Sequence, residues 1–193
     1  MERSQTSLVR LSTRDLAVAG IFGALSIVLS ATPLGFIPVP NVSGAATTIH
    51  IPAIIAGVVS GPLVGALVGL VLAATSWYYF SAIFLDFMNG NLFLALVVAF
   101  LPRLLIGVFA YYAYRALRGR PNIAAGTAGL VGTLTNSVGV LGLSLLLGTP
   151  AAASLIPIVL TNVPFEILLA VVLGIPIIAA LRAAWRGQIA GAQ

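Results

Sequence analysis

The long apolar segments of this 193-residue chain contain three polar side chains that could bind a ligand. Arg103, Asn136 and Glu166 each lie about ten to twelve residues from one end of an apolar run, or about 15 to 18 Å along a helix at 1.5 Å per residue. Those ends lie near Phe93, Gly148 and Leu155. If they share one face of a membrane, the three side chains lie at nearly the same depth.

A charge at that depth must avoid lipid, because an exposed one costs at least about 2.5 to 3.5 kcal/mol. One interpretation is an Arg103–Glu166 ion pair that joins two helices. The other is a polar ligand bound by Arg103 or Glu166, with hydrogen bonds from Asn136, Thr133, Thr135 and Asn162. The planar guanidinium of arginine suits a carboxylate in particular. Both interpretations stay open, and they are compatible.

Three further groups could border such a site. The stretch Trp77–Phe80, followed by Asp86 and Asn89, is expected in an outer loop, as an aromatic belt at the membrane interface or as a lid over a small molecule. The proline-rich stretch 33–40 would form the opposite lip. His50, the only histidine, is expected at the mouth of the site, either as an interfacial residue or as a ligand contact.

The composition leaves enzyme chemistry little support. Without lysine there is no phosphate-binding loop ending in Gly-Lys-Ser/Thr, so this chain does not hydrolyse ATP by that route, and any ATP drive must come from another subunit. One histidine and no cysteine exclude the usual zinc sites, disulfides and Cys–His nucleophiles. We therefore expect no catalytic residue, no metal and no cofactor.

The elements that must position these side chains are membrane helices. With 60% hydrophobic residues, 7% charged residues and a mean hydropathy of +1.14, the chain reads as an all-α integral membrane protein with one domain, 1–193, embedded in a lipid bilayer. The expected spans are 14–31, 46–60, 62–76, 93–117, 123–147 and 155–181.

Basic residues set the expected orientation. All nine are arginines, and eight form three clusters: Arg3, Arg10 and Arg14; Arg115, Arg118 and Arg120; Arg182 and Arg186. The positive-inside rule places these clusters in the cytoplasm, so both termini are expected there, and nucleic acid is not an expected partner. Both ends on one side require an even number of spans, which makes Gly61-Pro62 a tight turn between two helices and predicts a bundle of six.

Two segments have open alternatives. A helix from His50 to Ser60 would reach only about 17 Å of a core about 30 Å thick, so the span at 46–60 either borrows residues from Ala45 to Ile49 or is a partial span. In either case we expect this segment to border a cavity. The N-terminal run could be a cleaved signal peptide, but the later spans favour an anchor, and Ser12-x-x-Asp15 resembles a helix-start box.

Small residues four apart allow helices to approach closely. For Gly57, Gly61, Gly65 and Gly69 we expect packing within the chain. For Gly20 and Ala24, on the first helix, docking of a partner membrane protein is an alternative.

Taken in order, four motifs resemble the S components of energy-coupling factor (ECF) vitamin transporters, in the branch with pantothenate, folate and cobalamin members. They are Gly20–Ala24 continuing to Ser26, His50–Gly57 with Gly61-Pro62 and Gly65-Ala66, Leu101–Gly107, and Gly132–Asn136. The resemblance covers nearly the whole chain. It implies a six-helix bundle with cytoplasmic ends, in a bacterial or archaeal cytoplasmic membrane.

The resemblance also implies a function. Such proteins capture a vitamin from outside with high affinity, associate with a transmembrane coupling subunit and two ATPase subunits, and topple to release it inside. Gly20 and Ala24 would meet the coupling subunit. One arginine among amides and hydroxyls favours pantothenate, then folate or cobalamin. The alternatives are a secondary transporter that acts alone and a scaffold that transports nothing.

Overall fold

The computed structural model describes residues 11–40 and 45–190, with side chains as far as residue 185, so Arg3, Arg10 and the side chain of Arg186 lie outside the described part. Six α-helices account for most of it: α1 Thr13–Ala31, α2 Ile51–Ser60, α3 Pro62–Phe87, α4 Leu92–Ala116, α5 Pro121–Leu147 and α6 Leu155–Ala190. Short 3-10 turns occupy Pro33–Gly35 and Pro150–Ser154. Strands β1 Phe36–Pro38 and β2 Ala45–Thr47 pair antiparallel.

Five helices are long and apolar enough to cross a membrane, and α2 is too short. Large apolar side chains face outward on them, including Ile21, Phe93 and Leu146 at 66, 72 and 81% exposure. So many exposed large apolar side chains are typical of a surface that contacts lipid. The structure therefore agrees with an all-α membrane protein.

The span expected at 46–60 is wrong at its start. Helix α2 begins at Ile51 and spans only about 15 Å. Residues Ala45–Thr47 instead form strand β2, which pairs with β1 in a hairpin that the all-α prediction does not contain. Pro52 suits a helical first turn, whereas the pairing of β2 depends on a partner strand that precedes it in the chain. Because Thr47 and Ile49 line a cavity, the expectation that this segment borders one is confirmed.

The loop expected at Trp77–Phe80 is also wrong. Helix α3 continues to Phe87, because no glycine or proline occurs between Gly69 and the turn in which Asn89 and Gly90 adopt φ values of 51° and 74°. Of the residues expected to form a lid, Trp77–Phe80 and Asp86 therefore lie on a helix, and Asn89 lies in the turn that follows it.

Two local predictions are confirmed. Gly61 has a φ of 100°, a conformation that favours glycine, and it separates the end of α2 from Pro62, the first residue of α3. At the start of α1, the Ser12 hydroxyl accepts a hydrogen bond from the Asp15 backbone amide at 3.2 Å, and the Asp15 carboxylate accepts one from the Ser12 amide at 3.1 Å.

Glycines bring three helices into backbone contact. A Cβ added at Gly65 of α3 would lie 2.7 Å from the Gly57 Cα of α2 and 2.8 Å from the Gly107 Cα of α4. One added at Gly69 would overlap the carbonyl of Arg103. The prediction of internal packing is confirmed for Gly57, Gly65 and Gly69, and this packing sets the position of Arg103 on α4. It is wrong for Gly61, where an added Cβ would meet nothing within 4 Å.

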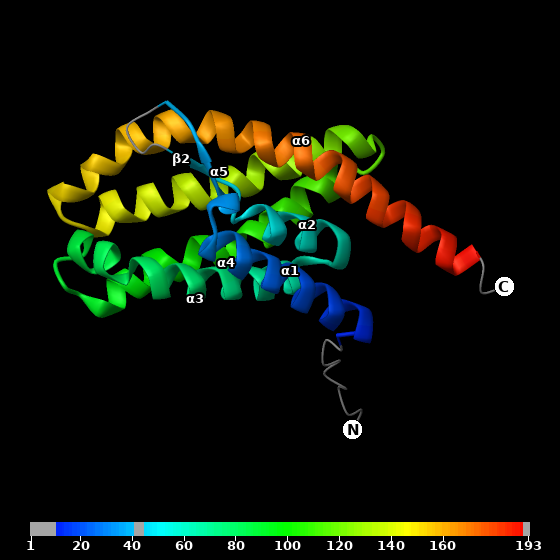
Figure 1. Ribbon diagram of the computed structural model, residues 1–193, viewed down its shortest axis with the longest axis horizontal. Coiled ribbons are helices and arrows are strands. Elements are labelled where there is room, and N and C mark those ends of the chain that lie inside the picture. The colour runs from blue at the N-terminus through cyan, green and yellow to red at the C-terminus, as the bar shows by residue number, and fades with distance from the viewer. Residues whose placement is uncertain (1–10, 41–44, 191–193) are drawn as a thin grey trace, which may run out of the picture.

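Helix α2 lies in the middle of the bundle, where it contacts all five other helices. Figure 1 shows α5 and α6 on one side of it and α3 and α4 on the other. The start of α1 and the end of α6 lie at the same end of the bundle as the α2–α3 and α4–α5 turns, opposite the α3–α4 and α5–α6 turns (Figure 1). At this shared end the Arg14 guanidinium lies 4.6 Å from the centre of the Trp185 ring.

Candidate functional site

A cavity of about 280 Å³ lies among α3, α4, α5, α6 and the hairpin. Most of its wall is apolar, and four phenylalanines contribute to it: Phe36, Phe80, Phe84 and Phe87. Its polar lining comes from Thr47, Ser76, Arg103, Asn136, Ser137, Asn162 and Glu166. An apolar wall with a few convergent polar groups is typical of a small-molecule site.

Arg103 brings a positive charge into this cavity. It is 8% exposed, its Nη1 donates to the Ala99 carbonyl at 2.8 Å, and its guanidinium lies 5.2 Å from the centre of the Phe84 ring. Among the described residues it forms no salt bridge with Glu166 within 4.0 Å. The two side chains expected to be close do line one cavity, but the protein itself leaves the guanidinium without a carboxylate partner there.

Glu166 is held by neutral groups instead. Its Oε1 accepts hydrogen bonds from the Thr47 backbone amide at 2.9 Å and the Thr47 hydroxyl at 2.7 Å, and its Oε2 accepts one from the Ser137 hydroxyl at 3.0 Å. A carboxylate has about four acceptor positions, so about one remains. Glu166 therefore ties β2 and α5 to α6 and can still accept from a ligand.

Three other polar groups face the same space. The Asn136 Oδ1 and the Ser76 Oγ are buried and have no hydrogen-bond partner in the described part of the chain. Leaving such a group unsatisfied costs about 1 to 3 kcal/mol, so each is a ready partner for a bound molecule. The Asn162 Nδ2 donates to the Ala45 carbonyl at 2.9 Å and helps to hold β2.

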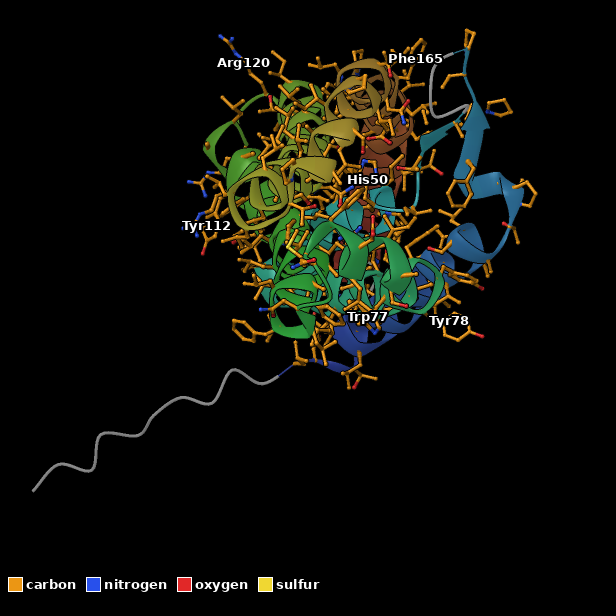
Figure 2. The ribbon with its side chains drawn as sticks, turned by 90° about the vertical axis from the view of Figure 1, so that its left-hand side faces the viewer. His50, Trp77, Tyr78, Tyr112, Arg120 and Phe165 are labelled. Atoms are coloured by element: carbon orange, nitrogen blue, oxygen red, sulfur yellow. The ribbon has the colours of Figure 1, made fainter. Side chains whose placement is uncertain are left out.

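His50 and Thr133 do not line the cavity, and the expectation that His50 lies at its mouth is wrong. Both residues are 0% exposed, and the His50 Nε2 lies 2.9 Å from the Thr133 hydroxyl oxygen. Figure 2 shows His50 at the centre of the bundle. His50 precedes α2, which is enclosed by the other helices, so the ring is carried into the core.

Of the residues expected in a lid, Phe80 lines the cavity and the others lie outside its lining. Trp77 stacks on Phe84 with ring centres 6.4 Å apart, and Tyr78, 79% exposed, projects from the periphery of the bundle (Figure 2). Asp86 and Asn89 are exposed at the end of α3. Successive residues on a helix point in different directions, so only one face of α3 can reach the cavity.

The prediction missed Thr47, Ser76 and Ser137. Ser76 lies on the α3 face that carries Phe80 and Phe84, a spacing of four and eight that helical periodicity could have revealed. Ser137 adjoins Asn136 in sequence. Thr47 had no comparable signal, because it reaches Glu166 across 119 residues.

Comparison with known proteins identifies the family. Residues 14–178 match the family model described as "ECF transporter, substrate-specific component". The chain belongs to this family. The resemblance found in the sequence is thereby confirmed, and this substrate-specific component is a transport protein of the membrane.

A curated relative supports the same assignment. The substrate-specific component is 32% identical to the pantothenic acid transporter PanT of Lactococcus lactis subsp. cremoris (strain MG1363). The alignment is 185 positions long and covers 86% of this chain and 93% of that relative. The similarity therefore includes every element that lines the cavity.

Proposed function

We propose that this substrate-specific component binds pantothenate with high affinity in the cavity that contains Arg103. The observation that carries the proposal is a buried guanidinium in a small cavity without a carboxylate partner among the described residues. Pantothenate supplies a carboxylate at one end. The similarity to PanT over most of both chains supports the same substrate.

The charges suggest how pantothenate would lie. Its carboxylate would meet Arg103 and stay away from Glu166, since two carboxylates at close range repel each other. The hydroxyl end could donate to the remaining acceptor position of Glu166, and the central amide could use the free Asn136 Oδ1 and Ser76 Oγ. Each unpartnered group of the cavity then has a complementary group on the ligand.

The size of the cavity favours pantothenate over the other candidates. About 280 Å³ is near the lower end of ligand pockets, which run from about 300 to 1,000 Å³. Folate is longer and cobalamin much larger, so both would need a wider cavity.

The family description names the substrate-specific component of an ECF transporter. Delivery inward would use partner subunits, for which we propose a transmembrane coupling subunit and two ATPases. Helix α1 offers a face of small residues for the coupling subunit, formed by Gly20 and the exposed Ala24. A Cβ added at Gly20 would meet nothing within 4 Å. The shared end of the bundle, with Arg14, Arg115 and Arg182, would face the cytoplasm of a bacterial or archaeal cell.

Ligand binding can be tested on the detergent-purified chain. Native mass spectrometry should detect co-purified pantothenate, and calorimetry should give tight binding of pantothenate but not of folate or cobalamin. Binding of another vitamin would overturn the assignment, and binding of none would favour the scaffold alternative.

Transport can be tested in proteoliposomes. Uptake should require ATP and the partner subunits. Uptake by this chain alone, driven by an ion gradient, would instead show a secondary transporter.

A further inference from the structure

Two adjoining cavities lie away from the proposed vitamin site. The first, of about 190 Å³, is lined by Tyr114, Asn122 and Arg182 together with apolar residues of α5 and α6. The second, of about 470 Å³, runs between α5 and α6. Both cavities are lined by Asn122 and Ile175, so the first cavity, here called the polar pocket, continues into the second along α5 and α6.

Arg182 supplies the charge of the polar pocket. Its Nη2 donates to the Val58 carbonyl at 2.9 Å, and its guanidinium lies 4.3 Å from the centre of the Tyr114 ring. Its Nε is buried and has no hydrogen-bond partner among the described residues. The guanidinium is thus held in place with a donor still unused.

The second cavity is an apolar groove. Ile123, Leu130, Ile167 and Val171 line it, with Gly126 in its floor. A Cβ added at Gly126 would meet Val171 and Ile175 at 3.7 and 3.8 Å, which are ordinary contact distances. A hydrocarbon chain could lie there between the two helices.

The surroundings of the polar pocket favour an anion. Arg115, Arg118 and Arg120 are exposed on the connection that leads into Pro121 and Asn122, and Arg120 projects from the bundle in Figure 2. The described residues that line the two cavities include no acidic side chain. The pocket also lies at the start of α5, the positive end of its dipole.

We infer that the two cavities form a binding site for one anionic phospholipid, with its phosphate at Arg182 and an acyl chain in the groove between α5 and α6. Charge complementarity selects the headgroup, since basic pockets between membrane helices attract anionic lipid headgroups. The continuous groove selects a lipid over a free anion. The cytoplasmic leaflet follows from the proposed orientation, but the lipid site does not depend on the proposed vitamin.

The test is native mass spectrometry of the purified chain titrated with phosphatidylglycerol, or with phosphatidylcholine that has the same acyl chains. We expect phosphatidylglycerol to bind about fivefold more tightly or better, and Arg182→Gln to remove that preference. Gly126→Leu should fill the groove and weaken phosphatidylglycerol at least about fivefold, without affecting pantothenate. Gly142→Leu is the matched control on α5, because a Cβ added at Gly142 would meet nothing within 4 Å and Gly142 lines neither cavity.

The groove variant keeps the proposal testable if Arg182→Gln folds poorly after losing its bond to Val58. Equal affinity for the two lipids would overturn the proposal. So would equal effects of Gly126→Leu and Gly142→Leu, or inorganic phosphate that binds as tightly as phosphatidylglycerol.

Discussion

Replacing Arg103 with methionine should weaken pantothenate binding by about 10- to 150-fold. The substitution keeps an unbranched side chain of similar length but removes every donor that could reach the ligand carboxylate. Hydrogen bonds to charged groups contribute about 1.5 to 3 kcal/mol, and 1.4 kcal/mol is a factor of ten in Kd. The affinity of Arg103→Lys for pantothenate should lie between those of the unchanged protein and Arg103→Met, since lysine keeps the charge but lacks the planar guanidinium.

The variant should still fold. Arg103 has no carboxylate within 4.0 Å in the described part, so its removal breaks no salt bridge. What it loses is one hydrogen bond to the Ala99 carbonyl and a ring contact with Phe84. Gel filtration and a melting curve in detergent check this.

The decisive measurement uses a second ligand. Panthenol carries a hydroxymethyl group in place of the carboxylate, so Arg103→Met should change its Kd by less than about threefold. Calorimetry on both proteins with both ligands completes a double-mutant cycle, and the coupling should be about 0.7 kcal/mol or more. An equal loss for both ligands would show that Arg103 only shapes the cavity, and unchanged pantothenate binding would place the carboxylate elsewhere.

Three further substitutions test other parts of the structure. Glu166→Gln should weaken the two hydrogen bonds from Thr47, because charge-assisted hydrogen bonds are about twice as strong as neutral ones. Hydrogen exchange at residues 45–47 should become faster and pantothenate binding about tenfold weaker; unchanged exchange would show that Glu166 does not hold β2 in place. Gly107→Ala should cost about 1 to 3 kcal/mol in stability, since its Cβ would lie 2.5 Å from the Gly65 Cα; the melting temperature should fall, whereas Gly142→Ala, which meets no neighbour, should not lower it. Gly20→Leu should leave pantothenate binding within about twofold but reduce ATP-driven uptake at least tenfold; normal uptake would remove α1 from the docking surface.

Much of the fold could be predicted because it follows from local or compositional signals. Apolar runs of membrane length identify helices, Gly61-Pro62 marks a turn, and Ser12 with Asp15 marks a helix start. The placement of Arg103, Asn136 and Glu166 in one cavity follows from their similar distances along three helices. Errors arose where a neighbour in space overrides the local pattern, as in β2, which pairs with a strand that precedes it.

The sequence by itself determined the membrane class, the family resemblance and four of the polar side chains that line the cavity, Arg103, Asn136, Asn162 and Glu166. Only the tertiary structure decided that Glu166 is held by Thr47 and Ser137 while Arg103 is left for a ligand, and that His50 is buried against Thr133. The physical reason is the distance along the chain over which each structural preference acts. Helix periodicity and turn preferences act over a few residues, whereas a hydrogen-bond partner depends on which helices pack together, and these partners are separated by 29 to 119 residues.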